Sequence, residues 1–271
     1  MPVVNLPTGR VVFDDLGAGP DVILFVHGHP FDRSMWTDAA EAAARQGWRA
    51  IIPDLRGYGD SSVTPGSVTL EDFAADLIAL LDSLGIAEVV VCGLSMGGQI
   101  SMALCDLHPD RVRGVIRAAT FPRAESEDGR AARYVVADRL EAEGMAAYAD
   151  ETLPRMLAPD SIERLPKVAE EVLAMMGRTP PDGAAAAWRG RAERKDYTET
   201  LRAFSRPALI VVGDQDAFTT PQDADVMSAA LSRCELLWLP GIGHMPNLEA
   251  ADRFNTALSE FLASLQSGEA Q

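Results

Sequence analysis

The chain is 271 residues long, with 47% hydrophobic and 24% charged residues and a formal net charge of −16. A chain of this size and composition can bury a full core, and it predicts one large α/β domain with an insertion. The acidic balance argues against nucleic acid and anionic membranes as partners. Because the N-terminal residues lack a secretory leader and no apolar run is long enough to span a bilayer, we expect a cytoplasmic protein.

Apolar runs and helical patterns alternate along the first half of the chain. Strands are expected over residues 21–28, 49–57, 89–91 and 112–118, and helices over residues 35–47, 69–84 and 98–108. Thr69 and Asp72 have the spacing of a capping box at the start of the second helix. This alternation predicts a mostly parallel central sheet flanked by helices.

The interval between residues 122 and 205 breaks this rhythm, because it contains helical patterns and no convincing strand. We expect a helical cap inserted between two parts of the core, residues 1–121 and 206–271. The charged residues of the cap are expected to form a solvated face. Its aromatic residues could line a pocket or hold the cap together. In the second part of the core, strands are expected over residues 208–213 and 235–240, a helix over residues 250–265, and a disordered tail at the end.

The stretch VVVCGLSMGGQI combines a β-branched run, a serine between glycines and a helical pattern. The spacing Gly93, Ser95, Gly97 is typical of a nucleophile elbow, in which a strained turn exposes the serine hydroxyl and requires small neighbours. The alternative is an ordinary glycine-rich connection. The predicted order of strand, turn and helix favours the elbow, with Ser95 as nucleophile.

A serine nucleophile needs a base and a group that orients the base. His244 lies in a glycine-bounded loop after the last predicted strand, at the carboxyl edge where open α/β sheets place their ligands. Asp214 and Asp216 both follow another strand, and the spacing favours Asp216 as the orienting acid and Asp214 as a turn residue. The chain order Ser95, Asp216, His244 is typical of the α/β-hydrolase fold.

Oxyanion stabilisation requires donors already aimed at the carbonyl oxygen. The backbone N–H groups of Met96 and His29 are the candidates, with Phe31 as the alternative to His29. A contact from the His29 side chain to substrate is the less favoured hypothesis, and His27 is expected to be structural.

Five stretches carry a resemblance over nearly the whole chain: HGHPFDRSMW, PDLRGYGDS, GLSMGG, VVGDQDAFTTP and GIGHMPNLE. With these marks the sequence resembles the α/β-hydrolase superfamily. The cap and the run DYTETLRAFSRPALIVVGDQD resemble the branch of 3-oxoadipate enol-lactonases, bacterial esterases and cofactor-free haloperoxidases. The resemblance implies hydrolysis of a carboxylic ester or lactone through an acyl-enzyme. Relatives that dehalogenate alkanes or open epoxides use an aspartate nucleophile, so Ser95 argues against both reactions.

The resemblance also implies an acyl pocket between core and cap for a small-molecule substrate. The candidate lining residues are Phe31, Met96, Phe121, Trp188, Phe218 and Met245, with core packing as the alternative for each. The chain contains no metal-ligand cluster and no GxGxxG fingerprint, so we expect no cofactor and no metal. The sequence leaves open whether the protein forms a homo-oligomer.

Several rival functions share these residues. The same triad could serve C–C bond hydrolysis, thioester cleavage, acyl transfer or perhydrolysis. A ligand-binding protein or a scaffold on a hydrolase fold is less favoured, because a pure binder has no need of all three triad residues.

Overall fold

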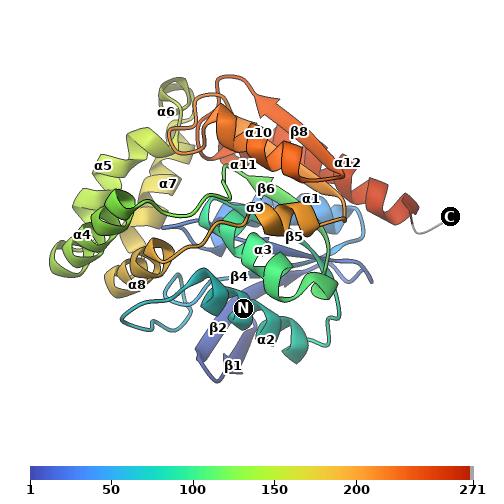
Figure 1. The fold of residues 1–271 in the computed structure, drawn as a ribbon, viewed down its shortest axis with the longest axis horizontal. Helices are drawn as coiled ribbons and strands as arrows, with labels where there is room; N and C mark the ends of the chain where they lie inside the picture. The colour runs from blue at the N-terminus through green and yellow to red at the C-terminus, as the bar shows by residue number, and fades with distance from the viewer. Residues whose placement is uncertain (269–271) are drawn as a thin grey trace.

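A computed structural model describes residues 1–268 and contains an eight-stranded sheet of order β1-β2-β4-β3-β5-β6-β7-β8 (Figure 1). The first two strands run antiparallel to their neighbours, and every pairing from β4 through β8 is parallel. The strands are β1 (Val3–Leu6), β2 (Gly9–Leu16), β3 (Val22–Val26), β4 (Arg49–Pro53), β5 (Val89–Leu94), β6 (Val112–Ala118), β7 (Ala208–Gly213) and β8 (Cys234–Leu239). The expected α/β-hydrolase fold is therefore confirmed.

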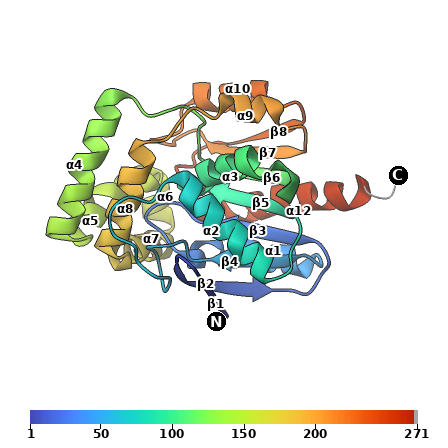
Figure 2. The ribbon, with the colours of Figure 1, turned by 60° about the horizontal axis from the view of Figure 1, so that its bottom comes forward.

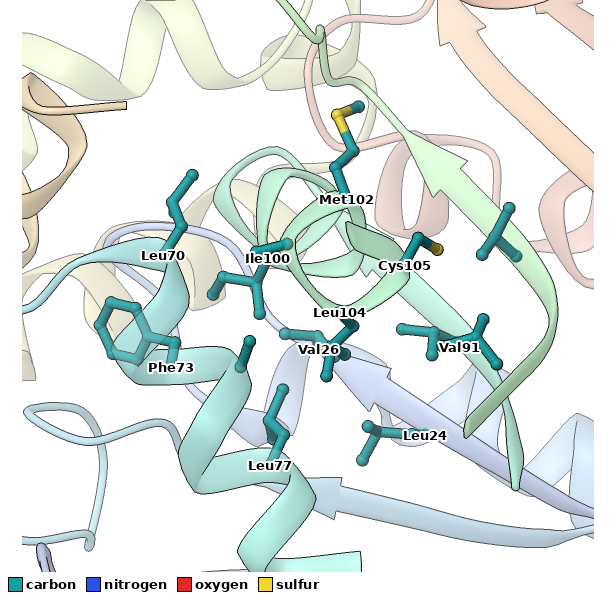
Figure 3. Packing of buried hydrophobic residues seen from close by; sticks show 14 of the residues in the cluster. Leu24, Val26, Leu70, Phe73, Leu77, Val91, Ile100, Met102, Leu104 and Cys105 are labelled. Carbon is teal, nitrogen blue, oxygen red and sulfur yellow. The ribbon is translucent and has the colours of Figure 1, made fainter. Parts of the chain in front are cut away.

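Helices cover both faces of this sheet (Figure 2). One face carries α1 (Thr37–Arg45) and α12 (Ala251–Gly268), and the other carries α2 (Leu70–Ser83), α3 (Met96–Leu107) and α10 (Pro221–Ala230). Successive residues of a strand point to opposite faces, so Leu24 and Val26 enter one core while Ile23 and Phe25 enter the other. Figure 3 shows the first of these cores, where β3 packs against α2 and α3.

The local signals read from the sequence explain where these elements begin. Thr69 accepts a hydrogen bond from the Asp72 N–H, and the Asp72 carboxylate accepts one from the Thr69 N–H, so both halves of the capping box are formed. The helix after the elbow starts at Met96, two residues earlier than expected, because the turn at Ser95 leads directly into it.

Two N-terminal strands have no counterpart in the sequence prediction. β1 and β2 form an antiparallel hairpin that pairs with β4 at the edge of the sheet. The residues of β1 alternate between exposed and half-buried positions, because this edge strand faces the core with only one side. β2 lies between β1 and β4 and has three consecutive buried residues, Val11, Val12 and Phe13.

Only helices lie between β6 and β7. They are α4 (Glu127–Glu143), α5 (Ala146–Met156), α6 (Pro159–Arg164), α7 (Pro166–Arg178), α8 (Pro181–Ala192) and α9 (Thr198–Ala203). We call α4 to α8 the cap; in Figure 1 they form the group to the left of the sheet. The last of the six, α9, falls inside the interval assigned to the cap but contacts α3 and α10 of the core.

The main chain of α8 sits directly on loops of the core. A Cβ atom at Gly183 would lie 2.0 Å from the Gly57 carbonyl oxygen, and one at Gly190 would lie 1.8 Å from the Val68 carbonyl oxygen. Between these contacts the Val68 N–H donates to the Ala186 carbonyl oxygen at 3.0 Å. Glycine at positions 183 and 190 is what allows this close approach.

Two further expectations concern the membrane and the tail, and the cysteines add an observation of their own. Cys92 and Cys105 are buried and Cys234 is half-buried, and burial raises the pKa of the Cys92 thiol well above its ordinary value, so it stays protonated. Among helices formed by residues 1–268, none has the length and apolarity of a membrane span. Most of the tail predicted to be disordered lies outside the described residues.

Candidate active site

Ser95 sits at the bend between β5 and α3 in a conformation that side chains rarely adopt, with φ 54° and ψ −112°. Its N–H donates to the Ala118 carbonyl oxygen at 2.9 Å. A Cβ atom at Gly93 would lie 2.3 Å from the Gly97 carbonyl oxygen, and one at Gly97 would lie 2.1 Å from the Val26 carbonyl oxygen. The glycines at both positions are therefore steric requirements of this turn.

His244 lies in the loop after β8 and pairs with Asp216, which follows β7. The His244 Nδ1 atom is 2.9 Å from Asp216 Oδ1 and 3.0 Å from Oδ2. Both side chains are buried, with 2% and 0% of their surface exposed. Since Nδ1 faces the carboxylate, Nε2 is the ring nitrogen left for a reacting group.

The Asp216 carboxylate is held in its ionised form. Burial alone would raise its pKa, but the His244 ring and the N–H groups of Phe218 and Thr219 together lower the pKa of Asp216 below its ordinary value. The two backbone donors lie 2.8 and 3.2 Å from Oδ1. Asp216 can therefore fix the orientation of the ring and stabilise an imidazolium.

Asp214 has a different role. Its Oδ1 atom accepts a hydrogen bond from the Gly241 N–H at 2.7 Å, which ties the end of β7 to the turn after β8. The structure thus brings Asp216 to His244 and places Asp214 in a turn.

A buried glutamate that the sequence reading did not single out anchors the His244 loop. The Glu249 carboxylate, at the end of α11 (Pro246–Glu249), accepts from the N–H groups of Gly243 and Met245, both at 3.0 Å, and of the cap residue Ala158 at 2.8 Å. The loop and the cap are therefore fixed to one carboxylate. The feature of the sequence that could have indicated this anchor is a glutamate five residues after the loop histidine.

The candidate oxyanion donors come from the start of α3 and from the loop after β3. Met96 is the first residue of α3, so its N–H is among those that lack a partner within the helix. Of the two candidates in the loop after β3, Phe31 uses its N–H in a turn to the Gly28 carbonyl oxygen at 3.0 Å, which leaves the N–H of His29 as the candidate. The His27 ring is satisfied by the Gly28 carbonyl oxygen at 2.9 Å and the Leu55 N–H at 3.0 Å, as a structural histidine requires.

One cavity of about 400 Å³ brings the candidate residues together between core and cap. Ser95, His244 and His29 line it, together with the predicted Phe121, Trp188 and Phe218. Phe31, Met96 and Met245 do not line it, and each is fully buried in the hydrophobic core. They adjoin site residues in sequence, but their side chains turn away from the cavity.

The cap wall of this cavity differs from the expected solvated face. Arg191 and Arg194 are only 7% and 4% exposed, and both line the cavity. Five arginines and one glutamate belong to the lining: Arg123, Arg133, Arg155, Arg191, Arg194 and Glu125. Arg191 lies in the last turn of α8, and Arg194 follows two residues after that helix ends, so helical spacing alone did not indicate that both would line the cavity.

Other sites are less suited to catalysis. A depression of about 550 Å³ at the amino ends of β7 and β8 is lined by Arg113, Arg233 and Cys234 among others, and by no histidine. Across residues 1–268, no three His, Cys, Asp or Glu side chains are placed to share a metal ion.

Comparison with known proteins gives relatives over most of the chain. The family model described as "alpha/beta hydrolase fold" matches residues 21–251. The 3-oxoadipate enol-lactonase 1 of Acinetobacter baylyi is 30% identical over 92% of both chains. A thermophilic esterase from Thermogutta terrifontis, solved with malate bound, is 37% identical with a TM-score of 0.92, covering 95% of this chain and 94% of its own. The enol-lactonase from Burkholderia xenovorans is 29% identical with a TM-score of 0.89, covering 97% of this chain and 100% of its own.

The match of the family model and the identity to these relatives agree with the sheet order and the elbow described above. The chain belongs to the α/β-hydrolase family and is a hydrolase.

Proposed function

We propose that this protein hydrolyses a carboxylic ester or lactone through an acyl-enzyme on Ser95. The observation that carries the proposal is the meeting of a strained serine and a carboxylate-oriented histidine in one cavity. An enol-lactonase and an esterase among the relatives support it.

In the first half of the reaction the Ser95 hydroxyl oxygen attacks the acyl carbonyl while His244 Nε2 takes its proton. Asp216 stabilises the imidazolium that forms, without itself becoming protonated. The imidazolium then protonates the leaving alcohol oxygen as the bond to the carbonyl carbon breaks, and the acyl group stays on Ser95.

In the second half His244 takes a proton from water, and the hydroxide attacks the ester carbonyl of the acyl-enzyme. Breakdown of this intermediate returns the proton to the Ser95 oxygen and releases the carboxylic acid. The N–H groups of Met96 and His29 stabilise the oxyanion in both halves, and the loss of one such donor lowers the rate by roughly a hundredfold to a thousandfold.

The proposal is tested by treating the folded protein with a fluorophosphonate and mapping the adduct by intact mass and peptide analysis. We expect one adduct on Ser95, and none when His244 is replaced by alanine, since the serine is not activated without its base. Asp214→Asn serves as the matched control and should label normally.

A folded protein in which Ser95 stays unlabelled would contradict the proposal, as would equal labelling of the His244→Ala variant. Labelling as expected is followed by turnover assays with esters and lactones.

A further inference from the structure

The cap wall of the cavity carries more positive charge than its carboxylates can pair. Arg123 forms an ion pair with Asp223, which lies outside the lining. Arg133 and Arg194 share Glu125. Glu125 is the only acidic residue in the lining described, so the positive charges of the lining outnumber the carboxylates that pair with them.

Two lining arginines, Arg155 and Arg191, form no ion pair within residues 1–268. Arg155 is exposed and lies over the Phe218 ring, whereas Arg191 is buried. The Arg191 Nε atom lies 3.3 Å from the Gln99 amide oxygen, and within residues 1–268 no carboxylate lies within 4.0 Å of its guanidinium. Burial, followed by the charges of Arg133 and Arg194, lowers the pKa of Arg191 well below its ordinary value. A buried and unpaired guanidinium is unfavourable, and an anion in the cavity would compensate it.

The His29 side chain adds a second unpartnered group. Its Nδ1 atom is 2.7 Å from the Tyr58 hydroxyl oxygen, while Nε2 is buried and has no partner in the described chain. The other acceptor near the Tyr58 hydroxyl is the Met96 sulfur at 3.9 Å, which is much weaker than an imidazole nitrogen. The hydroxyl therefore donates to Nδ1.

This assignment fixes the proton on the other ring nitrogen. Burial, followed by the charge of Arg191, lowers the pKa of His29 well below its ordinary value, so the ring is neutral and carries one proton. With Nδ1 accepting from Tyr58, that proton is on Nε2. The Nε2–H is thus a buried donor without an acceptor.

Trp188 lies beside both donors in the lining of the cavity. Its ring lies 5.3 Å from the His29 ring, and Arg191 Cζ lies 5.5 Å from the Trp188 ring. The lining around Trp188 therefore offers a guanidinium and an imidazole N–H. A ligand group that only accepts hydrogen bonds and is negatively charged fits both, and a carboxylate meets this description.

We propose that Arg191 and the His29 Nε2–H form a subsite for a carboxylate, so that the substrate is an ester or lactone bearing a second, ionised carboxylate. This inference rests on the proposed hydrolysis at Ser95. It assigns to His29 two roles, with the backbone N–H facing the reacting carbonyl and the side chain facing the distant carboxylate.

The test compares kcat/KM for two esters of similar length, monoethyl glutarate and ethyl pentanoate. The wild-type protein should favour the anionic ester, and Arg191→Met should lower that preference by roughly a hundredfold. His29→Phe keeps an aromatic ring beside Trp188 and removes the Nε2–H, so it should lower the preference by roughly tenfold.

Arg139→Gln is the matched control for loss of one positive charge on the cap. Arg139 pairs with Glu143 and Glu151 and lies outside the cavity lining, so the preference should stay within about twofold of wild type. A wild-type protein that favours the neutral ester would overturn the subsite, as would an unchanged preference in folded Arg191→Met. If circular dichroism shows that Arg191→Met does not fold, the subsite is tested by the preference of the wild-type protein for the anionic ester and by the loss of that preference in His29→Phe.

Calorimetric titration of glutarate separates the subsite from the reaction. We expect glutarate to bind to Ser95→Ala and to lose measurable binding when Arg191→Met is added. If glutarate binds but no ester is turned over, the result supports the carboxylate subsite and contradicts the proposed hydrolysis. Turnover of neutral esters without glutarate binding would keep hydrolysis and reject the subsite.

Discussion

The two walls of the active-site cavity differ in how completely their polar groups are paired. On the core wall, Asp216 accepts from His244 and two backbone N–H groups, and the Ser95 N–H is bonded to the neighbouring strand. On the cap wall, Arg191 has no carboxylate partner within the described chain. The groups that we propose for catalysis are thus held in place by hydrogen bonds within the protein, whereas the proposed recognition group Arg191 has no carboxylate partner there.

The same contrast holds for charge. The chain has a net charge of −16, yet five arginines and one glutamate line the cavity. Net charge describes solubility and long-range partners, and the side chains lining a site decide which ligand it accepts.

The largest effect expected is the loss of the nucleophile. Ser95→Ala should lower kcat by roughly 10⁴-fold or more, since the remaining rate depends on binding and oxyanion donors. The core wall should otherwise be intact, so the melting temperature should change little. Steady-state kinetics and a thermal melt check both statements, and near-normal turnover would show that the chemistry lies elsewhere.

The two aspartates after β7 sharpen the comparison within the core wall. Asp216→Asn should lower kcat by roughly 10³- to 10⁴-fold, because the amide can favour the wrong tautomer of His244. Asp214→Asn keeps an oxygen that can accept from the Gly241 N–H, so its kcat should fall by less than about tenfold. Parallel kinetic assays rank them, and the reverse ranking would make Asp214 the orienting acid.

Glu249 links the two walls. Glu249→Gln replaces one carboxylate oxygen by an NH₂ group that faces a backbone N–H, so we expect a loss of about 1–3 kcal/mol in unfolding free energy. Misplacement of His244 should also lower kcat by roughly tenfold to a hundredfold. Urea denaturation and kinetics measure the two losses. A drop in stability alone would mean that this carboxylate does not position the histidine.

The buried histidines predict how the stability of the protein depends on pH. Burial lowers the pKa of both His27 and His29, so below about pH 6.5 the unfolded chain binds protons that the folded chain does not. The free energy of unfolding should therefore fall between pH 6.5 and 5, by up to about 1.4 kcal/mol per pH unit for each histidine. Denaturation of wild type and His29→Phe at several pH values checks this, with a shallower slope expected for the variant.

The core wall was largely predictable from the sequence because local sterics determine it. An elbow needs small residues at fixed positions, and parallel strands bring the segments after their carboxyl ends to one edge. The choice of Asp216 over Asp214 also depended on a local feature, the spacing of each residue from the end of its strand.

The cap wall was not predictable in the same way. Whether an arginine of α8 faces water or the cavity depends on how α4 packs over it, and that packing is not encoded in the spacing of α8 alone. For the same reason Phe31, Met96 and Met245 were wrongly expected in the cavity lining, since nearness in sequence to site residues does not fix the direction of a side chain.

The close approach of α8 to the core has a consequence for how substrates are selected. Main chain meets main chain at Gly183 and Gly190, so no side chain there can rotate or compress to let the helix shift. We therefore expect Trp188, between these contacts, and Arg191, beside the second, to occupy the same positions with and without ligand. Selection among acyl groups would then follow from the shape of the empty pocket, and wider pockets would have to be obtained by shortening side chains, because α8 itself cannot move outward without losing both contacts.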